Sequence, residues 1–565
     1  MASIDIWTIL IFSLIVFITG LSFLRTGSNI KSFFAGGGAI PWWMSGLSLF
    51  MSFFSAGTFV VWGSIAYTNG MVAITIQWTM CLAGIIVGLA IAPMWNRTKV
   101  VTAAQFITLR LSYNTQKLYT TLFLLISMFT TGAFLYPVAK IVEVSTGIPL
   151  STSIIILGLL IIIYTAVGGL WAVIVTDILQ FIVLTAAVLI VVPLAIEKVD
   201  GIAEFLNRMP KSHFDIFSDE YTMIFVIGMI LYNSVYIGGN WAYVQRYTSV
   251  AKPSEAKKVA WLFSALYMFS PIIWMLPPMI YRVVNPNLEG FANEGAYLLM
   301  CKEVLPQGML GLMLGAMVFA TASSVNTTLN ISAGVLTNDI FKKIFKQSKD
   351  RTTMIFARSA TVVFGVLTII VALMVPKMGG IVEVVLSVGA ITGGPLFLPP
   401  IWAMFSKRQN ARSIFGVTII SLAVNIFFKF ISPEVMNLNL SRGMEMIVGA
   451  SLPAFLLLIT EAYLYFTKSV KTQYRIDYDI NKEKCIINPK ETKNDQSDQA
   501  NLYGRRVIAT GILVIGLLIV GLSLIADFGQ LLISSMGGII CVLALLIWPW
   551  SSTRLSFNNR KQNKL

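Results

Sequence analysis

Runs of about 20 consecutive apolar residues recur along almost the whole of this chain of 565 residues. Each run is long enough to cross the roughly 30 Å hydrocarbon core of a bilayer as a helix. Only 12% of the residues are charged, about half of the share that a soluble domain carries. The runs are continuous and do not alternate polar and apolar residues with a period of two, which argues against a transmembrane β-barrel. The pattern predicts an all-α polytopic membrane protein embedded in a lipid bilayer.

Fifteen of these runs are predicted to be transmembrane helices. They are residues 5–25, 42–66, 70–95, 116–144, 149–168, 170–194, 219–245, 258–283, 307–338, 354–376, 380–406, 411–431, 444–467, 507–526 and 529–549. We predict four parts: a transmembrane core over 1–467, a hydrophilic cytoplasmic loop over 468–506, a transmembrane hairpin over 507–549 and a basic cytoplasmic tail over 550–565. A small regulatory element within the loop is an alternative interpretation of that polar segment.

The net charge of +15 reflects topology. If the N-terminus lies outside the cell, most of the 41 Lys and Arg residues fall in segments on the cytoplasmic side. Such an excess is the positive-inside bias of inner or plasma membrane proteins. We therefore predict an outside N-terminus and a cytoplasmic C-terminus, and no binding of nucleic acid.

Side chains for catalysis or for binding a transition metal are scarce. One histidine, His213, and four scattered cysteines exclude a zinc cluster and a CxxC redox motif. An intramembrane enzyme would need paired acids or a Ser–His pair, whereas a single carboxylate, Asp177, stands out at membrane depth. We predict that the protein is not an enzyme.

Two of the predicted spans carry small or helix-breaking residues at their centres. Ser55, Ala56 and Gly57 interrupt the first span of a set of five over 42–194. The run Gly238–Gly239–Asn240 interrupts the first span of a second set over 219–406. Interrupted apolar segments at corresponding positions of two halves indicate a transporter with a midplane binding site. Glycine can also serve close helix packing.

The segment "FATASSVNTTLN" (319–330) places seven hydroxyl or amide side chains in an apolar span. On a helix Ala320, Ser323, Ser324, Thr327 and Thr328 share one face. Hydroxyl and carbonyl oxygens suit a small hard cation such as Na⁺. The alternative is that these hydroxyls bond back to their own helix or hold neighbouring helices together.

Asp177 lies within a predicted span, eight residues after Gly169. A carboxylate at this depth is costly unless it is paired or solvated, so it indicates a functional site. The alternative is an acid at a helix end that reaches the cytoplasmic interface. A hydroxyl pair with a nearby carboxylate is a plausible ligand set for sodium.

Four motifs in order resemble the sodium:solute symporter family, which includes the sodium/glucose cotransporters. The motifs are "PWWMSGLSLFMSFFSAGTF", "YTAVGGLWAVIVTDILQ", "NWAYVQRYTSVAKPSEAKK" and "FATASSVNTTLNISAGVLTNDI". The resemblance implies a five-plus-five inverted repeat of the leucine-transporter type, with helices 42–194 and 219–406 as the repeats, one helix before them and four after. It also implies Na⁺ as the coupling ion.

The resemblance further implies which residues bind ions. The family's characteristic sodium site falls here on the carbonyls of Met51, Phe54 and Ala320 and the hydroxyls of Ser323 and Ser324. Relatives that move a second Na⁺ use an aspartate and two hydroxyls, at positions held here by Asp177, Asn326 and Thr327. The amide of Asn326 replaces one hydroxyl, which separates this chain from that pattern.

The solute contacts implied by the resemblance are Gly57, Thr58, Gln77, Asn233, Tyr236 and Tyr267. Asn233 and the gate tyrosine Tyr236 match the bacterial sugar transporter, whereas Gln77 and Tyr267 replace a glutamate and a lysine. We find no buried Lys or Arg at this depth, which disfavours an ionic solute. The expected function is sodium-coupled import of a neutral sugar or polyol. The alternatives are a symporter for an organic acid, sialic acid or amino acid and, more distantly, a transporter-fold sensor.

Overall fold

The structure, a computed structural model, describes residues 3–22, 40–100, 102–164, 170–341, 345, 350–467 and 495–550. Within helices it leaves out some side chains, including those of Ser323, Asn326 and Thr327. The described chain consists of helices and short connections, without a β-strand. Among these residues 11 helices are long and apolar enough to cross a membrane, or 12 if one bent pair counts as a span. The total of fifteen spans stays a prediction.

The first predicted repeat is built from one interrupted helix and the helices that follow it. Its elements are α3 (Trp42–Met51), η2 (Thr58–Trp62), α4 (Gly63–Asn69), α5 (Met71–Ile86), η3 (Val87–Ile91), α6 (Ala92–Thr98), α7 (Ala103–Arg110), α8 (Tyr113–Thr146), α9 (Leu150–Tyr164) and α10 (Leu170–Lys198). The connection to the second repeat contains α11 (Ile202–Arg208) and η4 (Lys211–Phe214).

The second predicted repeat also opens with an interrupted helix. Its elements are α12 (Met223–Gly239), α13 (Trp241–Thr248), α14 (Pro253–Val284), η5 (Gly290–Gly295), α15 (Ala296–Val304), α16 (Met309–Val335), η6 (Leu336–Phe341), α18 (Asp350–Met374), η7 (Val375–Met378) and α19 (Gly380–Phe405). Both repeats thus begin with a break, as the two sequence interruptions predicted.

The break in the first repeat is stabilised by a threonine. α3 ends at Met51, and the Ser55 N–H donates to the Phe53 carbonyl at 3.1 Å rather than to Met51 four residues back. The Thr58 hydroxyl donates to the Phe53 carbonyl and accepts from the Ser55 N–H at 3.3 Å. The carbonyl of Met51 therefore loses its regular helical donor, which leaves it available to a ligand.

The break in the second repeat is made by asparagine. Asn240 has an extended backbone, and its side-chain oxygen accepts from the Ala242 N–H at 3.0 Å as the N-cap of α13. α12 and α13 are bent by 61° at this point. Gly238 and Gly239 remain helical and instead permit close packing, because a Cβ on them would lie 2.8 Å from Ile91 Cδ1 and 2.7 Å from Phe397 Cβ. The glycines serve packing, and Asn240 directs the break.

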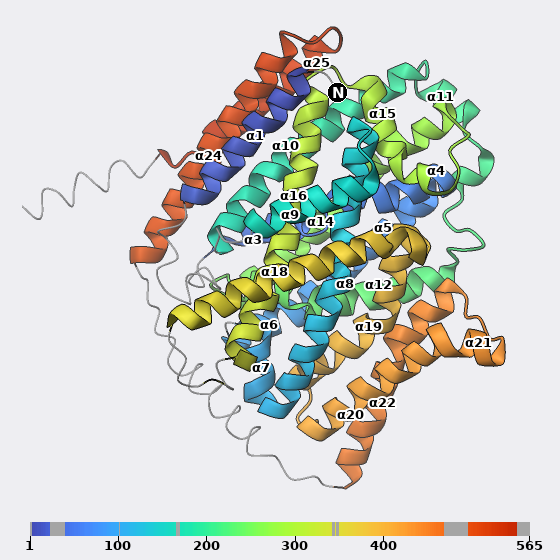
Figure 1. Cartoon of the computed structure of the whole chain (residues 1–565), viewed down its shortest axis with the longest axis vertical. Coiled ribbons are helices and arrows are strands. Elements are labelled where there is room, and N and C mark those ends of the chain that lie inside the picture. Colours follow the sequence, from blue (N-terminus) through green and yellow to red (C-terminus); the bar gives the residue numbers. More distant parts are fainter. Residues whose placement is uncertain are drawn as a thin grey trace, which may run out of the picture.

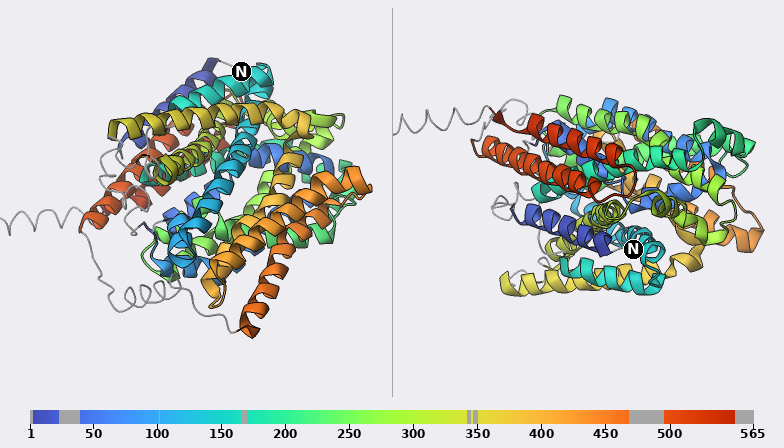
Figure 2. Two further views of the ribbon diagram at one scale, coloured as in Figure 1. Left: turned by 60° about the horizontal axis from the view of Figure 1, so that its bottom comes forward. Right: turned by 90° about the horizontal axis from the view of Figure 1, so that it is seen from above.

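Helices at both ends of the chain flank the repeats. They are α1 (Ser3–Ser22), α20 (Ala411–Ile426), η8 (Phe427–Ile431), α21 (Ser432–Met436), α22 (Arg442–Phe466), α24 (Asp495–Ser523) and α25 (Gln530–Ile547). Figure 1 shows α1 beside α24 at one edge of the bundle, and Figure 2 shows α24 and α25 running together as a pair.

The C-terminal pair begins with a helix that extends into the predicted loop. α24 begins at Asp495, so the last residues of the segment 468–506 are helical, and the division of the chain into four parts stays a prediction. Residues 468–494 of the predicted loop and 551–565 of the predicted tail lie outside the described residues.

Candidate sodium and solute site

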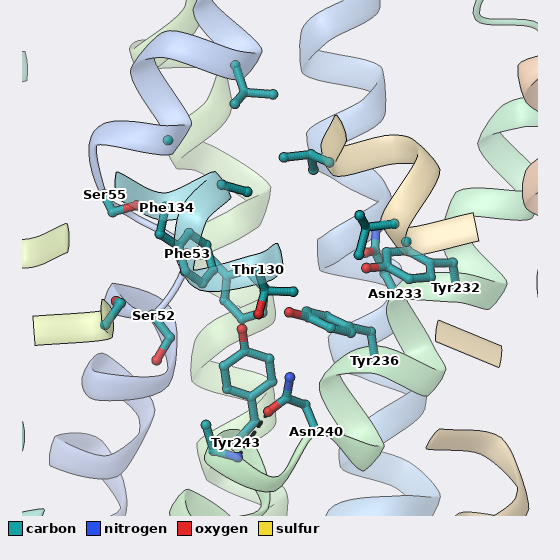
Figure 3. Close-up of a pocket in the computed structure, with 18 of the residues that line it drawn as sticks. Ser52, Phe53, Ser55, Thr130, Phe134, Tyr232, Asn233, Tyr236, Asn240 and Tyr243 are labelled. Atoms are coloured by element: carbon teal, nitrogen blue, oxygen red, sulfur yellow. Dashed lines mark hydrogen bonds between the residues drawn. The ribbon is translucent and has the colours of Figure 1, made fainter. Parts of the chain in front are cut away.

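A cavity of about 210 Å³ lies between the two interrupted helices. Its walls come from the α3–η2 break, α5, α8, the α12–α13 bend and α19, and it reaches α10 and α16 (Figure 3). All the predicted solute contacts line it, namely Gly57, Thr58, Gln77, Asn233, Tyr236 and Tyr267. Asp177 and Ser324 line the same cavity. The structure therefore brings predicted solute and ion residues to one space.

The neutral polar groups of the cavity differ in how they are already engaged. Gln77 on α5 is 2% exposed, and its amide makes no hydrogen bond to any residue that the structure describes. The Asn233 amide nitrogen on α12 donates to the Thr79 hydroxyl at 2.9 Å. The hydroxyl of Thr58 is occupied within the α3–η2 break. Gln77 is thus the amide with the most unused hydrogen-bonding capacity toward a solute.

Aromatic rings form much of the cavity wall. Tyr236 stacks on Tyr232 with ring centroids 5.3 Å apart and meets the Tyr243 ring edge-on at 5.6 Å. Phe53, from the first break, lies 4.8 Å from the Tyr243 ring. Figure 3 shows the hydroxyls of Tyr236 and Tyr243 pointing into the same space beside Thr130. Rings from both broken helices therefore converge at the cavity.

Sequence reasoning missed several cavity residues. They are Ser52, Phe53, Thr130, Asn240 and Tyr243. The motif "NWAYVQR" held a usable signal, because a helix capped by Asn240 carries Tyr243 within its first turn, beside the break. No comparable signal marked Thr130, whose depth on the long helix α8 depends on tertiary packing.

The face of α16 predicted to hold sodium lies against the first break. The Ala56 N–H donates to the Thr321 hydroxyl at 3.1 Å, which ties the broken segment to α16. The Ser324 hydroxyl lies 3.4 Å from the Ala320 carbonyl oxygen and borders the cavity. The side chain of Ser323 lies outside the described part, and coordination of Na⁺ by Met51, Phe54, Ala320, Ser323 and Ser324 stays a prediction.

Asp177 on α10 belongs to a buried polar cluster. The Ser48 hydroxyl on α3 donates to Asp177 Oδ2 at 2.6 Å, and Arg246 Nη2 on α13 lies 4.0 Å from the same oxygen. Asp177 is 5% exposed and Arg246 3% exposed. The side chains of Asn326 and Thr327, the other predicted ligands of a second Na⁺, lie outside the described part.

Arg246 overturns one statement from the sequence. We expected no buried Lys or Arg at the depth of the cavity, but Arg246 is buried and lines it. The residue escaped notice because it stands near the end of its span, where arginine ordinarily reaches the interface. The 61° bend at Asn240 alters the course of this segment.

Two broken helices, a cavity between them with a few polar side chains, and a hydroxyl-bearing helix face beside it are typical of a secondary transporter of the inverted-repeat class. The family model described as the sodium:solute symporter family matches residues 33–420, so this chain belongs to that family. It is an integral membrane transporter that uses Na⁺ as its coupling ion, which confirms the resemblance drawn from the four motifs.

Individual relatives agree with this assignment. The chain is 26% identical over 469 residues to a sodium/glucose cotransporter of Vibrio parahaemolyticus, covering 76% of this chain and 85% of the relative. The structure is similar to a Na⁺-coupled sialic acid symporter in a substrate-bound, outward-open state, with a TM-score of 0.69, 22% identity, and coverage of 82% of this chain and 98% of that chain. It is also similar to a nucleobase-cation-symport-1 family transporter, with a TM-score of 0.53, 14% identity, and coverage of 80% and 99%. The all-α leucine-transporter-type fold is thereby confirmed.

Proposed function

We propose that this symporter couples the inward flow of Na⁺ to import of a neutral, hydroxyl-rich solute such as a sugar or polyol. The observation that carries the proposal is the cavity lining. The amides of Gln77 and Asn233 and the hydroxyls of Tyr236 and Tyr243 are neutral groups that can both donate and accept hydrogen bonds. The tyrosine rings offer flat apolar faces, and a mainly apolar wall with a few placed polar groups is typical of a small-molecule site.

Sodium supplies the driving force for accumulation. Each Na⁺ that moves down a membrane potential of about 100 mV releases roughly 2.3 kcal/mol, and a tenfold sodium gradient adds about 1.4 kcal/mol. We propose that Met51, Phe54, Ala320, Ser323 and Ser324 hold the coupling ion. Ser324 supports this placement because it borders the solute cavity, so ion and solute would stabilise the same arrangement of helices. Asp177 would bind a second Na⁺, or it would lie near the first Na⁺ without binding it directly.

A carboxylate-bearing solute is the second candidate. Arg246 lines the cavity, and a guanidinium is a strong partner for a carboxylate. A second reason to consider carboxylate-bearing solutes is that a sialic acid symporter has the same fold. Against it, Arg246 already contacts Ser48 and faces Asp177 at 4.0 Å. A carboxylate solute would have to take the guanidinium away from a buried acid.

Uptake into proteoliposomes that contain the purified protein tests both candidates. A labelled sugar or polyol should accumulate only with an inward Na⁺ gradient, and choline in place of Na⁺ should abolish accumulation. Unlabelled neutral sugars should compete, whereas sialic acid and simple organic acids should not. Competition by the acids alone would replace the neutral class by the anionic one and leave sodium symport intact.

A further inference from the structure

The pairing of Asp177 with Arg246 is loose for a buried ion pair. The closest approach of the guanidinium to the carboxylate is 4.0 Å, from Nη2 to Oδ2. A direct charge-assisted hydrogen bond would be about 2.7–2.9 Å. The Ser48 hydroxyl contacts both groups, since it donates to Asp177 at 2.6 Å and accepts from Arg246 Nη2 at 3.2 Å. The positive charge therefore compensates the carboxylate without direct contact.

Arg246 is held mainly by groups other than Asp177. Its Nη1 donates to the Ala242 carbonyl of its own helix at 2.9 Å, and its Nε lies 3.4 Å from the Ser48 hydroxyl. These contacts would persist if another cation took the carboxylate. A buried carboxylate in a membrane protein needs some positive partner, and here that partner is fixed to the short helix α13 beyond a bend.

The carboxylate can also be reached from the cavity. Asp177, Arg246 and Ser324 all line this space, as does Thr328 one turn further along α16. A small cation in the cavity could therefore approach Asp177 from the side of the α16 hydroxyls. It would meet the carboxylate at a shorter distance than the guanidinium does, because Na⁺ has no bulky planar group to accommodate.

We propose that Arg246 is a tethered counter-cation that competes with Na⁺ for Asp177. It neutralises the carboxylate while Na⁺ is absent, and it gives up the carboxylate when Na⁺ binds. The guanidinium thus lowers sodium affinity and lets the ion leave. Arg246 and the cavity residue Tyr243 both belong to α13. Release of Arg246 on Na⁺ binding therefore also affects the cavity wall that contacts the solute. This inference rests on the proposed sodium role of Asp177 and is independent of which solute is carried.

The test is equilibrium binding of radioactive Na⁺ to the purified full-length protein without solute, at constant ionic strength set with choline. Arg246→Gln should bind Na⁺ about tenfold more tightly than the unchanged protein, since the competitor is gone. Arg246→Lys keeps the charge and should stay within about threefold of it. Asp177→Asn should remove the gain, so that the Arg246→Gln, Asp177→Asn double variant binds no more tightly than Asp177→Asn alone.

A second readout covers the case in which Arg246→Gln is poorly stable. The thermal midpoint should be lower than that of the unchanged protein without Na⁺ and should rise more steeply with Na⁺ concentration. Two results would overturn the proposal: weaker Na⁺ binding in Arg246→Gln, or equal changes of Na⁺ affinity in the Gln and Lys variants. Either would show that Arg246 has a purely structural role. Failure of sugar uptake with the expected binding pattern would reject only the proposed solute class.

Discussion

Ser324 is the described hydroxyl whose position best fits a role in sodium binding. It lies on the cavity side of α16, with its oxygen 3.4 Å from the Ala320 carbonyl oxygen. A hydroxyl at this distance makes at most a weak hydrogen bond to its own helix, so turning toward a cation costs little. Ser332 on the same helix is different, because its hydroxyl pairs with Ser127 at 2.9 Å.

Ser324→Ala should raise the Na⁺ concentration for half-maximal uptake about fivefold, since one oxygen ligand worth about 1 kcal/mol is lost. Initial uptake rates in proteoliposomes across a Na⁺ series measure this. Ser332→Ala is the matched control and should leave the sodium dependence unchanged. Equal sodium curves for Ser324→Ala and the unchanged protein would remove Ser324 from the ion site.

Gln77 provides the corresponding test for solute binding. Gln77→Met keeps the length of the side chain and removes both hydrogen-bonding groups, so the solute concentration for half-maximal uptake should rise about three- to tenfold. Sodium binding without solute should not change, because Gln77 lies on α5 and not on the sodium face of α16. A variant that instead weakens Na⁺ binding would place Gln77 in the ion site.

At the scale of one element, α19 contains a built-in discontinuity. Pro395 has no N–H, so the carbonyl of Ile391 four residues earlier lacks its helical donor. Asn425 on α20 supplies the missing hydrogen bond, since its amide nitrogen donates to Ile391 at 3.1 Å and to Ala390 at 3.3 Å. Nearby Gly394 allows α22 to approach closely, because a Cβ there would lie 2.1 Å from the Gly449 carbonyl oxygen. A side-chain hydrogen bond from a neighbouring helix thus replaces the missing backbone hydrogen bond.

Asn425→Ala should lower the stability of the protein by about 1–3 kcal/mol, because a buried carbonyl loses its donor. Asn425→Asp should be at least as damaging, since it sets a carboxylate against two carbonyl oxygens. Thermal unfolding in detergent compares the variants. Ser421→Ala on the same helix is the control, because that hydroxyl bonds only within α20. An Asp variant as stable as the unchanged protein would contradict the donor role.

The whole molecule shows which features a sequence of this kind can predict. Apolar runs predicted the helices because a lipid environment forces long continuous segments, and the family resemblance that the four motifs indicated predicted part of the cavity lining. The Asp177 cluster was missed because its members are 129 and 198 residues apart in sequence and meet only through tertiary packing. The purpose of Gly238 and Gly239 was also hidden, because close packing and helix breaking use the same residue type.

Both repeats also meet at the end of the bundle that we predict to be extracellular. Glu294 in η5 is 4% exposed, and it accepts from the Tyr136 hydroxyl of α8 at 2.7 Å and from the Ile381 N–H at the start of α19 at 3.3 Å. Its neighbour Asn293 accepts from Ser64 of α4 at 3.0 Å. One short segment therefore joins helices of both repeats at this end of the bundle.

We predict that the hydrogen bonds of Glu294 hold this end closed and that this closure depends on pH. Burial raises the pKa of this carboxyl, against the lowering effects of its hydrogen bonds and of Lys140 and with a small raising effect of Glu143. Because the buried carboxyl binds its proton more tightly than an exposed one, the closed arrangement gains stability as pH falls through the raised pKa and loses it as pH rises. Acid outside the vesicle should therefore slow opening of this end and lower the initial uptake rate, with the internal pH held constant.

Glu294→Gln mimics the protonated group, so its uptake should be slower at neutral pH and should lose most of the dependence on external pH below neutrality. Tyr136→Phe removes one stabilising donor of the carboxylate and should move the midpoint of the pH profile upward. If Glu294→Gln and the unchanged protein share one pH profile, the proton acts elsewhere and Glu294 is only a structural link between the two repeats.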